Sequence, residues 1–244
     1  MDADPLSSMR AEIHELRTLV EDGLKQIRDQ VHANALAHYA QVEALLSLHN
    51  VIRFKHPLPP MRGWSISPDF ALILISVIRA HRPRVIVELG SGVSTIICGY
   101  VLEGLGAGRL ISLEHVPVFA EISSRAIQLH ELSPIAQIKH APLRTLELPS
   151  GTWQWYDPAC LNGIEAHSVD LVIVDGPPGH TQPLARYPAI PALHKWMRSG
   201  ALVLVDDANR PDEKRMVDRW LSEGLCRNHL SLQSEKGAML LMAS

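Results

Sequence analysis

Cysteine is scarce in this sequence, and aromatic residues make up only 5% of its 244 positions. The three cysteines, Cys98, Cys160 and Cys226, form no CxxC pair and cannot all pair with one another, so no disulfide framework is expected. Free thiols fit a reducing compartment, and we therefore expect a cytoplasmic protein.

Long apolar runs and clusters of one charge are also missing. The longest apolar run, residues 70–78, is too short to span a bilayer, and the acidic, polar start of the chain is unlike a signal peptide. A net charge of -3 without any basic run gives no electrostatic case for a nucleic-acid partner. The length instead suits one α/β domain with an appendage.

Proline is absent between residues 9 and 50, where the pattern predicts one long helix. Apolar or small residues recur there with a period of nearly 11 residues, which is typical of a straight or slightly right-handed stripe. The stripe consists of Ile13, Leu16, Val20, Leu24, Ile27, Val31, Ala35, His38, Val42 and Leu45. It packs either on the chain's own domain or on another subunit. Because so long a helix would overhang a small domain, we favour the second and expect a homo-oligomer.

Three prolines, Pro57, Pro59 and Pro60, end the helical pattern and force an extended connection. We therefore place a domain boundary here, between an N-terminal helical segment (1–60) and a second domain (61–244).

From residue 68 onward, apolar strands alternate with helices, which indicates a mostly parallel sheet covered on both faces. Strands are expected at 84–88, 109–114, 136–140, 169–175 and 201–206, and helices at 68–81, 94–105, 116–132, 188–197 and 212–223. The last two strands, 226–233 and 238–242, have only a short turn between them and should form an antiparallel hairpin. The expected fold is thus a doubly wound α/β domain with a seven-stranded sheet.

The first strand runs into a glycine turn, ELGSGVS, at residues 88–94. Open α/β sheets bind ligands at the carboxyl ends of their strands, and glycines let the backbone approach a ligand closely. Ser94 and Thr95 are suited to cap the next helix, whose amides then face an anion. A nicotinamide dinucleotide site has a similar turn, so the glycines alone indicate only a nucleoside-binding fold.

Two acids favour a different ligand from a dinucleotide. Glu88 directly precedes the turn, where a carboxylate repels a pyrophosphate but suits the ammonium of an amino-acid ligand. Glu114 ends the second strand, where its two oxygens can accept both hydroxyls of a ribose. Taken singly, Glu88 could instead bond a helix end or loop, and Glu114 could be a solvated strand end.

Four segments resemble the strand ends of class I S-adenosylmethionine-dependent methyltransferases: VIVELGSGVSTI, ISLEH, VDLVIVDGPPG and GALVLVDDA. The resemblance covers about residues 67–244 and is strongest to bacterial small-molecule and sugar O-methyltransferases. Ser94 stands where a third glycine often sits in this family.

The resemblance implies S-adenosylmethionine as cofactor. It assigns the methionine part to Glu88, Gly90, Ser91 and Gly92. It assigns the ribose to Glu114, with His115 beside it, and the adenine to the neighbourhood of Ala141 and Leu143.

Asp175, Asp206 and Asp207 end the fourth and fifth strands. Three acids at one edge repel one another unless a cation lies among them, and Mg²⁺ prefers such oxygen ligands. Metal-dependent relatives of the resembled family use acids at these strand ends, which implies a metal site here. In the alternative, one acid contacts the cofactor, for which Asp175 is the candidate, and the others bond loop amides.

His180 follows the stiff Gly-Pro-Pro-Gly turn after Asp175, and both residues are candidate catalytic groups. A histidine has a suitable pKa for a general base, although an exposed loop histidine is the alternative. The aromatic segment 151–157 either walls an acceptor or covers the core as a short strand. Residues 64–68 are suited to close over the cofactor, and Arg186 and Tyr187 either contact substrate or pack.

The sequence therefore predicts a methyltransferase that methylates a hydroxyl of a small molecule or saccharide. The alternatives are an NAD-dependent oxidoreductase and a non-catalytic scaffold that assembles through the long helix. The acid before the glycine turn and the final hairpin speak against the oxidoreductase.

Overall fold

The computed structural model describes residues 5–244, and the contacts divide the chain after Glu43 into two compact units. The first unit consists of helix alone. The second unit, Ala44–Ser244, begins earlier than the boundary expected at residue 60, because Ala44, Leu48 and Ile52 are already buried.

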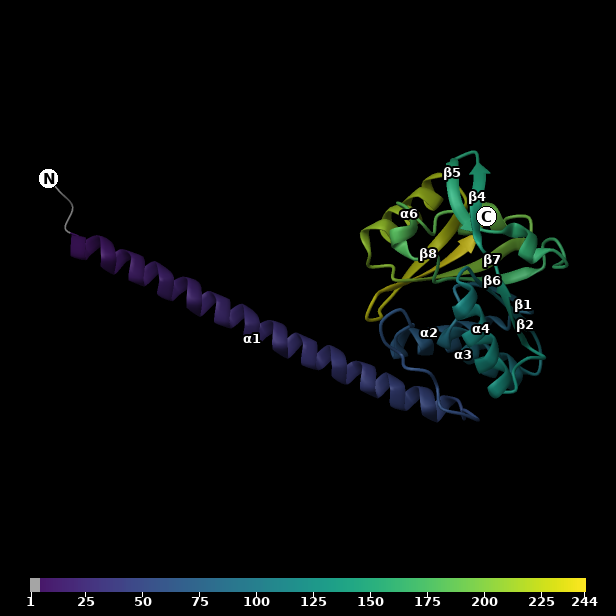
Figure 1. The fold of residues 1–244 in the computed structure, drawn as a ribbon, viewed down its shortest axis with the longest axis horizontal. Coiled ribbons are helices and arrows are strands. Elements are labelled where there is room, and N and C mark those ends of the chain that lie inside the picture. The colour runs from purple at the N-terminus through teal and green to yellow at the C-terminus, as the bar shows by residue number, and fades with distance from the viewer. Residues whose placement is uncertain (1–4) are drawn as a thin grey trace. The chain divides into compact units, whose positions relative to one another are not determined.

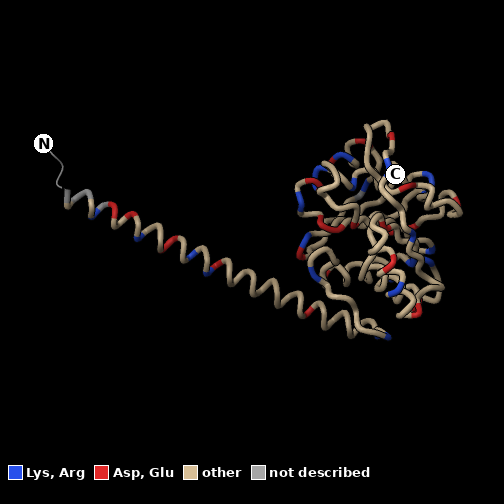
Figure 2. The backbone as a smooth tube through the Cα atoms, viewed as in Figure 1, with Lys and Arg blue, Asp and Glu red and all other residues tan. Residues whose placement is uncertain are grey.

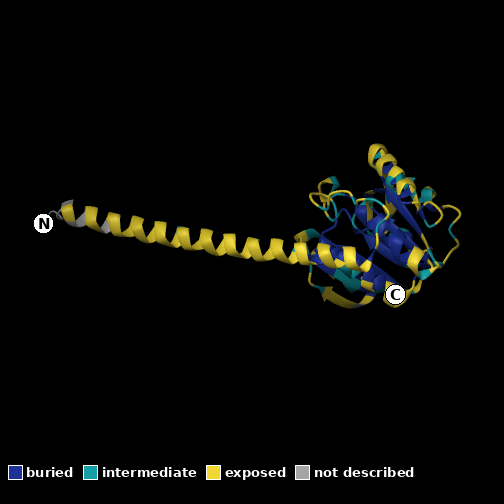
Figure 3. Cartoon of the chain, turned by 90° about the horizontal axis from the view of Figure 1, so that it is seen from below, coloured by how far each residue is buried: buried dark blue, intermediate teal, exposed yellow. Residues whose placement is uncertain are grey.

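The predicted long helix is confirmed as α1 (Pro5–Val51), 47 residues in one uninterrupted element. Figure 3 marks nearly all of its described residues as exposed along the part that belongs to the first unit. The apolar stripe of this part has no partner within the described residues of the first unit: Ile13, Leu24 and Val31 are 52%, 61% and 62% exposed.

The second unit is built on one seven-stranded sheet (Figure 1), and the predicted α/β fold is confirmed. The strand order is β3-β2-β1-β6-β7-β9-β8. The strands are β1 (Val85–Leu89), β2 (Arg109–Glu114), β3 (Ala136–His140), β6 (Val169–Val174), β7 (Met197–Asp206), β8 (Cys226–Leu232) and β9 (Ala238–Ala243). The first five run parallel, and β9 pairs antiparallel with both β7 and β8, as the short turn predicted.

Helices cover both faces of the sheet, because its central strands are apolar on both sides. In β1, Ile86 faces one core cluster, and Val85, Val87 and Leu89 face the other. The first cluster lies under α2 (Pro68–His81), α3 (Val93–Leu105) and α4 (Pro117–Leu129). The second lies under α5 (Ala189–Leu193) and α6 (Pro211–Ser222). This alternation makes the domain doubly wound.

The aromatic segment is the strand β5 (Gly151–Tyr156), which pairs antiparallel with β4 (Leu143–Leu148). No strand was predicted at β4, whose alternating LRTLEL pattern is the available signal. The helix expected at 188–197 is wrong in length. Only Ala189–Leu193 is α-helical, because Met197 already begins β7 and pairs with Val169 of β6.

Cys98, Cys160 and Cys226 are all free thiols in the structure. Within residues 5–244, no helix combines the length and apolar character that crossing a bilayer requires.

Candidate functional site

A cavity of about 520 Å³ opens at the carboxyl ends of β1, β2, β6 and β7. From β1 the chain continues to β2 on one side of the sheet, and from β6 it continues to β7 on the other side. The strand order therefore reverses between β1 and β6, where the cavity lies. Its walls come from residues 90–96, 114–126, 175–186 and 207–210, with Lys236 and the segment 59–66 closing it. The cavity lies at the sheet edge where a ligand site was predicted, but Glu88, Ala141 and Asp206 are not among its described lining residues.

The glycine turn after β1 forms one wall through Gly90, Ser91 and Gly92. Gly90 has a φ of +96°, which disfavours any other residue. A β-carbon there would stand 3.4 Å from the carbonyl carbon of Asp175, so the ends of β1 and β6 approach closely. The turn therefore brings its backbone and Asp175 to the same wall.

Glu88 lies behind this turn, fully buried, and is not among the described residues that line the cavity. Its Oε2 accepts a hydrogen bond of 2.6 Å from Thr95 Oγ1, which in turn accepts from the backbone N–H of Gly92 at 3.0 Å. Burial raises the pKa of Glu88 to about 7, against the opposing hydrogen bonds of nearby hydroxyls. Glu88 thus holds the turn and the start of α3 in place.

Glu114 faces the cavity from the end of β2. Its carboxylate accepts hydrogen bonds from the backbone N–H groups of Ser91 at 3.2 Å and Val116 at 2.9 Å, and His115 Nδ1 lies 3.2 Å away. Burial alone would raise the pKa of Glu114, but these contacts outweigh it and lower the pKa. The site therefore presents a fixed negative charge beside the glycine turn.

The side of the cavity next to Glu114 is apolar and comes from α4 and from Val116, which directly precedes it. Val116, Phe119, Ile122 and Ala126 line it, at helical spacings of three and four. The resemblance placed the adenine near Ala141 and Leu143 instead. Ala141 is fully buried, donates its backbone N–H to the carbonyl of Glu114, and is not among the described lining residues. The signal was present, because apolar residues recur on an otherwise exposed face of α4.

At the far end of the cavity, Asp175, Asp206 and Asp207 meet as expected, with one carboxylate oxygen of each within 4.8 Å of the others. Both oxygens of Asp206 and Oδ1 of Asp207 are buried without a hydrogen-bond partner among the described residues. Burial, together with the neighbouring Asp207, raises the pKa of Asp206 to about 6. Burial and Asp206 also hold the pKa of Asp175 well above its usual range.

A buried guanidinium, Arg186, compensates part of this negative charge. Its Nη2 lies 2.8 Å from Asp207 Oδ2 and donates to the carbonyl of Asp175 at 3.0 Å, and its Nη1 donates to the carbonyl of Asp206 at 3.1 Å. Arg210 adds a second pair with Asp207 Oδ2 at 2.9 Å. Sequence reasoning left Arg186 open between substrate contact and packing, and the structure gives it the acid cluster as its partner.

His180 lies on an exposed turn, Gly179–Thr181, at the rim of the cavity, and its ring is 6.0 Å from that of Trp64. Ser65, next to Trp64, accepts a hydrogen bond of 2.8 Å from Lys236 Nζ. The segment 64–66 is thereby joined to the turn between β8 and β9 over the cavity mouth.

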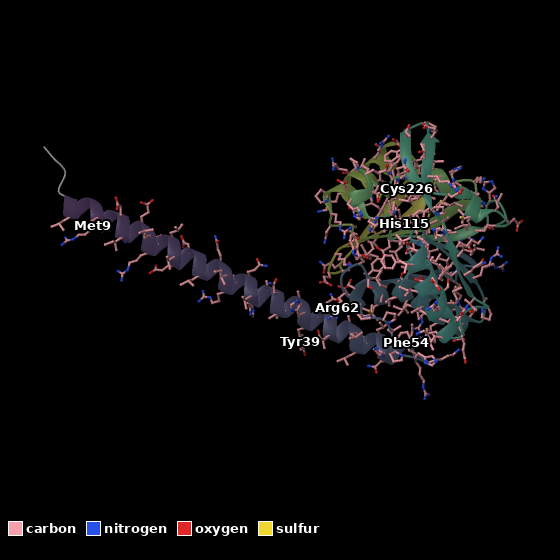
Figure 4. The ribbon with its side chains drawn as sticks, viewed as in Figure 1. Met9, Tyr39, Phe54, Arg62, His115 and Cys226 are labelled. Carbon is pink, nitrogen blue, oxygen red and sulfur yellow. The ribbon has the colours of Figure 1, made fainter. Side chains whose placement is uncertain are left out.

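Most aromatic side chains of the segment 151–157 pack in the core and do not line the cavity. Trp153 stacks on Tyr187 with ring centroids 4.8 Å apart, and Trp155 is 2% exposed in the core. Tyr156 alone lines the cavity, where its ring contacts that of His115 at 6.0 Å (His115 is labelled in Figure 4). The core thus uses the two tryptophans, and the site uses the tyrosine.

Solved structures share this fold, among them the following three. The O-methyltransferase from Bacillus cereus in complex with SAH has a TM-score of 0.56 at 17% identity, covering 86% of this chain and 97% of its own. SAH-bound PaMTH1 from Podospora anserina has a TM-score of 0.59 at 15% identity, and the match covers 87% of this chain and 95% of its own. TomG from Streptomyces achromogenes is an O-methyltransferase of tomaymycin synthesis in complex with SAM. It has a TM-score of 0.54 at 18% identity, and the match covers 84% of this chain and 89% of its own.

No curated protein matches the sequence. A family model described as a methyltransferase domain matches residues 87–208, half of the chain, and these residues include the glycine turn, Glu114 and all three aspartates. The matched residues supply most of the lining of the cavity. The chain therefore belongs to the methyltransferase domain family.

Proposed function

We propose that this protein transfers a methyl group from S-adenosylmethionine to a hydroxyl of a small molecule or saccharide. One observation carries the proposal: a single cavity joins a glycine turn and an ionised acid at one end to an acid cluster at the other. The first end suits the nucleoside and the second suits the acceptor. The SAH and SAM in the three similar structures support this donor.

The residues proposed to bind the cofactor lie in the glycine turn and beside it. Gly90, Ser91 and Gly92 present backbone and hydroxyl groups to the methionine part, and Glu114 accepts from the ribose hydroxyls. The apolar α4 wall offers Phe119 and Ile122 to the adenine ring. Glu88 acts through Thr95, which keeps the turn in position.

Asp175, Asp206 and Asp207 would hold a divalent cation, and their unpartnered buried oxygens fit one, because a hard cation prefers carboxylate ligands. Such an ion supplies a positive charge that lowers the pKa of a bound acceptor hydroxyl. Arg186 fixes the orientation of Asp207 and the backbone of Asp175, so the cluster is ready before the ion binds.

His180 is the candidate general base, because it lies at the rim on the same loop as Asp175. Methyl transfer needs the nucleophile, the methyl carbon and the sulfur in line, so positioning supplies most of the rate. The base removes only the hydroxyl proton.

Calorimetric titration with SAH and with NAD tests the donor. We expect SAH to bind and NAD to give no heat, because the chain belongs to a methyltransferase family and the similar structures hold SAH or SAM. Binding of NAD alone would overturn the proposal. Incubation with S-adenosylmethionine and panels of saccharides and phenols, read by mass spectrometry, then identifies the acceptor class.

Chelation tests the metal separately. Excess EDTA should lower methyl transfer at least tenfold and Mg²⁺ should restore it, because the acids otherwise repel the acceptor oxygen. SAH affinity should stay unchanged in the same samples. Full activity in EDTA would remove the cation from the proposal and leave the donor site intact.

A further inference from the structure

The apolar stripe of α1 is covered by nothing within the described residues of the first unit. Val20, Ile27 and Val42 are 57%, 62% and 53% exposed, and Figure 4 shows Met9 and Tyr39 projecting from the helix. A lone helix in water gains too little from its backbone hydrogen bonds to stay folded, so its stability must come from packing this face. The stripe therefore needs a partner that runs along its whole length.

The period of the stripe restricts that partner. Its 3-4-4 spacing repeats every 11 residues, and only a helix with the same period keeps its apolar residues against it over 13–42. At 1.5 Å per residue this is a seam of about 45 Å. A second copy of α1 has this period by definition.

The charges beside the stripe favour one orientation of a second copy. On a wheel of 11 residues in three turns, Glu12, Gly23 and Asn34 lie along one edge of the stripe. Arg17, Arg28 and Tyr39 lie along the other edge. In a parallel, in-register pair, residues five positions apart on opposite edges meet across the seam.

In such a pair, Glu12 lies opposite Arg17 of the partner subunit, and symmetry gives two of these attractive pairs. Gly23 and Asn34 carry no charge, so they do not repel the residues of the opposite edge. In an antiparallel pair over 13–42, residue 28 would lie beside its own copy and the two Arg28 side chains would repel. The helix is also free of Lys, Arg, Asp and Glu between Asp29 and Glu43 (Figure 2), so no charge opposes contact there.

We propose that residues 9–42 of α1 form a parallel, in-register, two-stranded coil with a second copy of this chain. The narrow stripe of three positions in eleven suits two helices. This inference does not depend on the chemistry of the cavity.

Light scattering on the full chain tests the pairing. We expect twice the chain mass of 27.0 kDa for the wild type and the single-chain mass for Ile27→Lys, which puts a charge into the seam. Gln26→Lys, on the opposite face, is the matched control and should stay paired. A wild type of single-chain mass, or of three or more copies, overturns the proposal. SAH binding should be equal in all three proteins, which separates this test from that of the proposed function.

Charge exchange tests the orientation. Glu12→Arg and Arg17→Glu should each raise the dimer dissociation constant about tenfold, since two attractive pairs become repulsive. The double variant should return to the wild-type value. Glu15→Arg and Lys25→Glu, which lie away from the seam, are the controls, and circular dichroism checks that helix content is equal. Failure of the double variant to recover would exclude the parallel register.

Discussion

Glu88 and Glu114 are two buried acids at neighbouring strand ends, and the groups around them set opposite pKa shifts. Glu88 has one oxygen bonded to Thr95 and the other buried without a partner among the described residues, so desolvation dominates and raises its pKa to about 7. Glu114 accepts from two backbone N–H groups beside His115, and its pKa falls. Only Glu114 therefore presents a full charge to a ligand at neutral pH.

Replacing Glu114 by alanine should weaken SAH binding roughly tenfold to a hundredfold, because a charged acceptor of hydrogen bonds is lost. Calorimetry measures the change. Glu121→Ala, an exposed acid of α4, is the control and should bind as the wild type does. Equal affinity of Glu114→Ala would remove Glu114 from the cofactor site.

Glu88 makes the stability of the protein depend on pH. Its folded pKa of about 7 lies above the ordinary value of 4.5, so the folded state binds the proton more tightly. Its stabilisation is complete below pH 4.5 and is lost as the pH rises through 7, which amounts to about 3 kcal/mol.

Glu88→Gln should remove this part of the pH dependence. Urea unfolding at pH 5 and pH 8 measures it in both proteins, and the difference between the two pH values should shrink by about 3 kcal/mol in the variant. An identical pH profile for Glu88→Gln would mean that Glu88 is not desolvated in the folded protein.

At the scale of elements, the loop after β6 organises the end of the cavity that holds the three aspartates. It carries Asp175, the turn of His180, and the buried Arg186, and the peptide between Gly176 and Pro177 is cis. Gln182 ties this loop to the β4–β5 hairpin. Its side chain accepts from the backbone N–H of Gln154 at 2.9 Å and donates to the carbonyl of Gln154 at 3.0 Å, as a neighbouring strand would.

Gln182→Ala should free this loop locally. Hydrogen exchange at the amide of Gln154 should become roughly tenfold faster, while the free energy of unfolding changes by less than about 1 kcal/mol. Gln128→Ala on the exposed side of α4 is the control. If exchange at Gln154 is unchanged, this pair of hydrogen bonds does not hold the loop.

At the scale of the whole molecule, the chain consists of two compact units that divide after Glu43. All described residues that line the 520 Å³ cavity belong to the second unit. The second unit also contains both core clusters, so it has what an independent domain requires.

A chain of residues 44–244 should therefore fold and bind SAH within about twofold of the full chain's affinity. Calorimetry and thermal unfolding of both proteins measure this. Loss of SAH binding in a shortened chain that still unfolds cooperatively would show that the first unit contributes to the site.

Local sequence signals were sufficient for most elements. Helix α2 and strands β2 and β3 have the predicted bounds. Pro68 marks the start of α2, and a buried apolar run marks β2. The β4–β5 pair escaped prediction, since a two-stranded sheet has a short, weak alternation. The overlong helix at 188–197 came from a pattern that β-pairing of Met197 overrides.

The sequence by itself determined the sheet, the glycine turn and the gathering of Asp175, Asp206 and Asp207, because strands of a parallel sheet end at one edge. Only the tertiary structure decided which groups face the cavity and which charges they carry. It put Glu88 behind the turn, lined the cavity with apolar residues of α4 but not with Ala141, and buried Arg186 among the acids. Burial and pairing depend on residues far apart in the chain, such as Arg186 and Asp207, and no local pattern records that proximity.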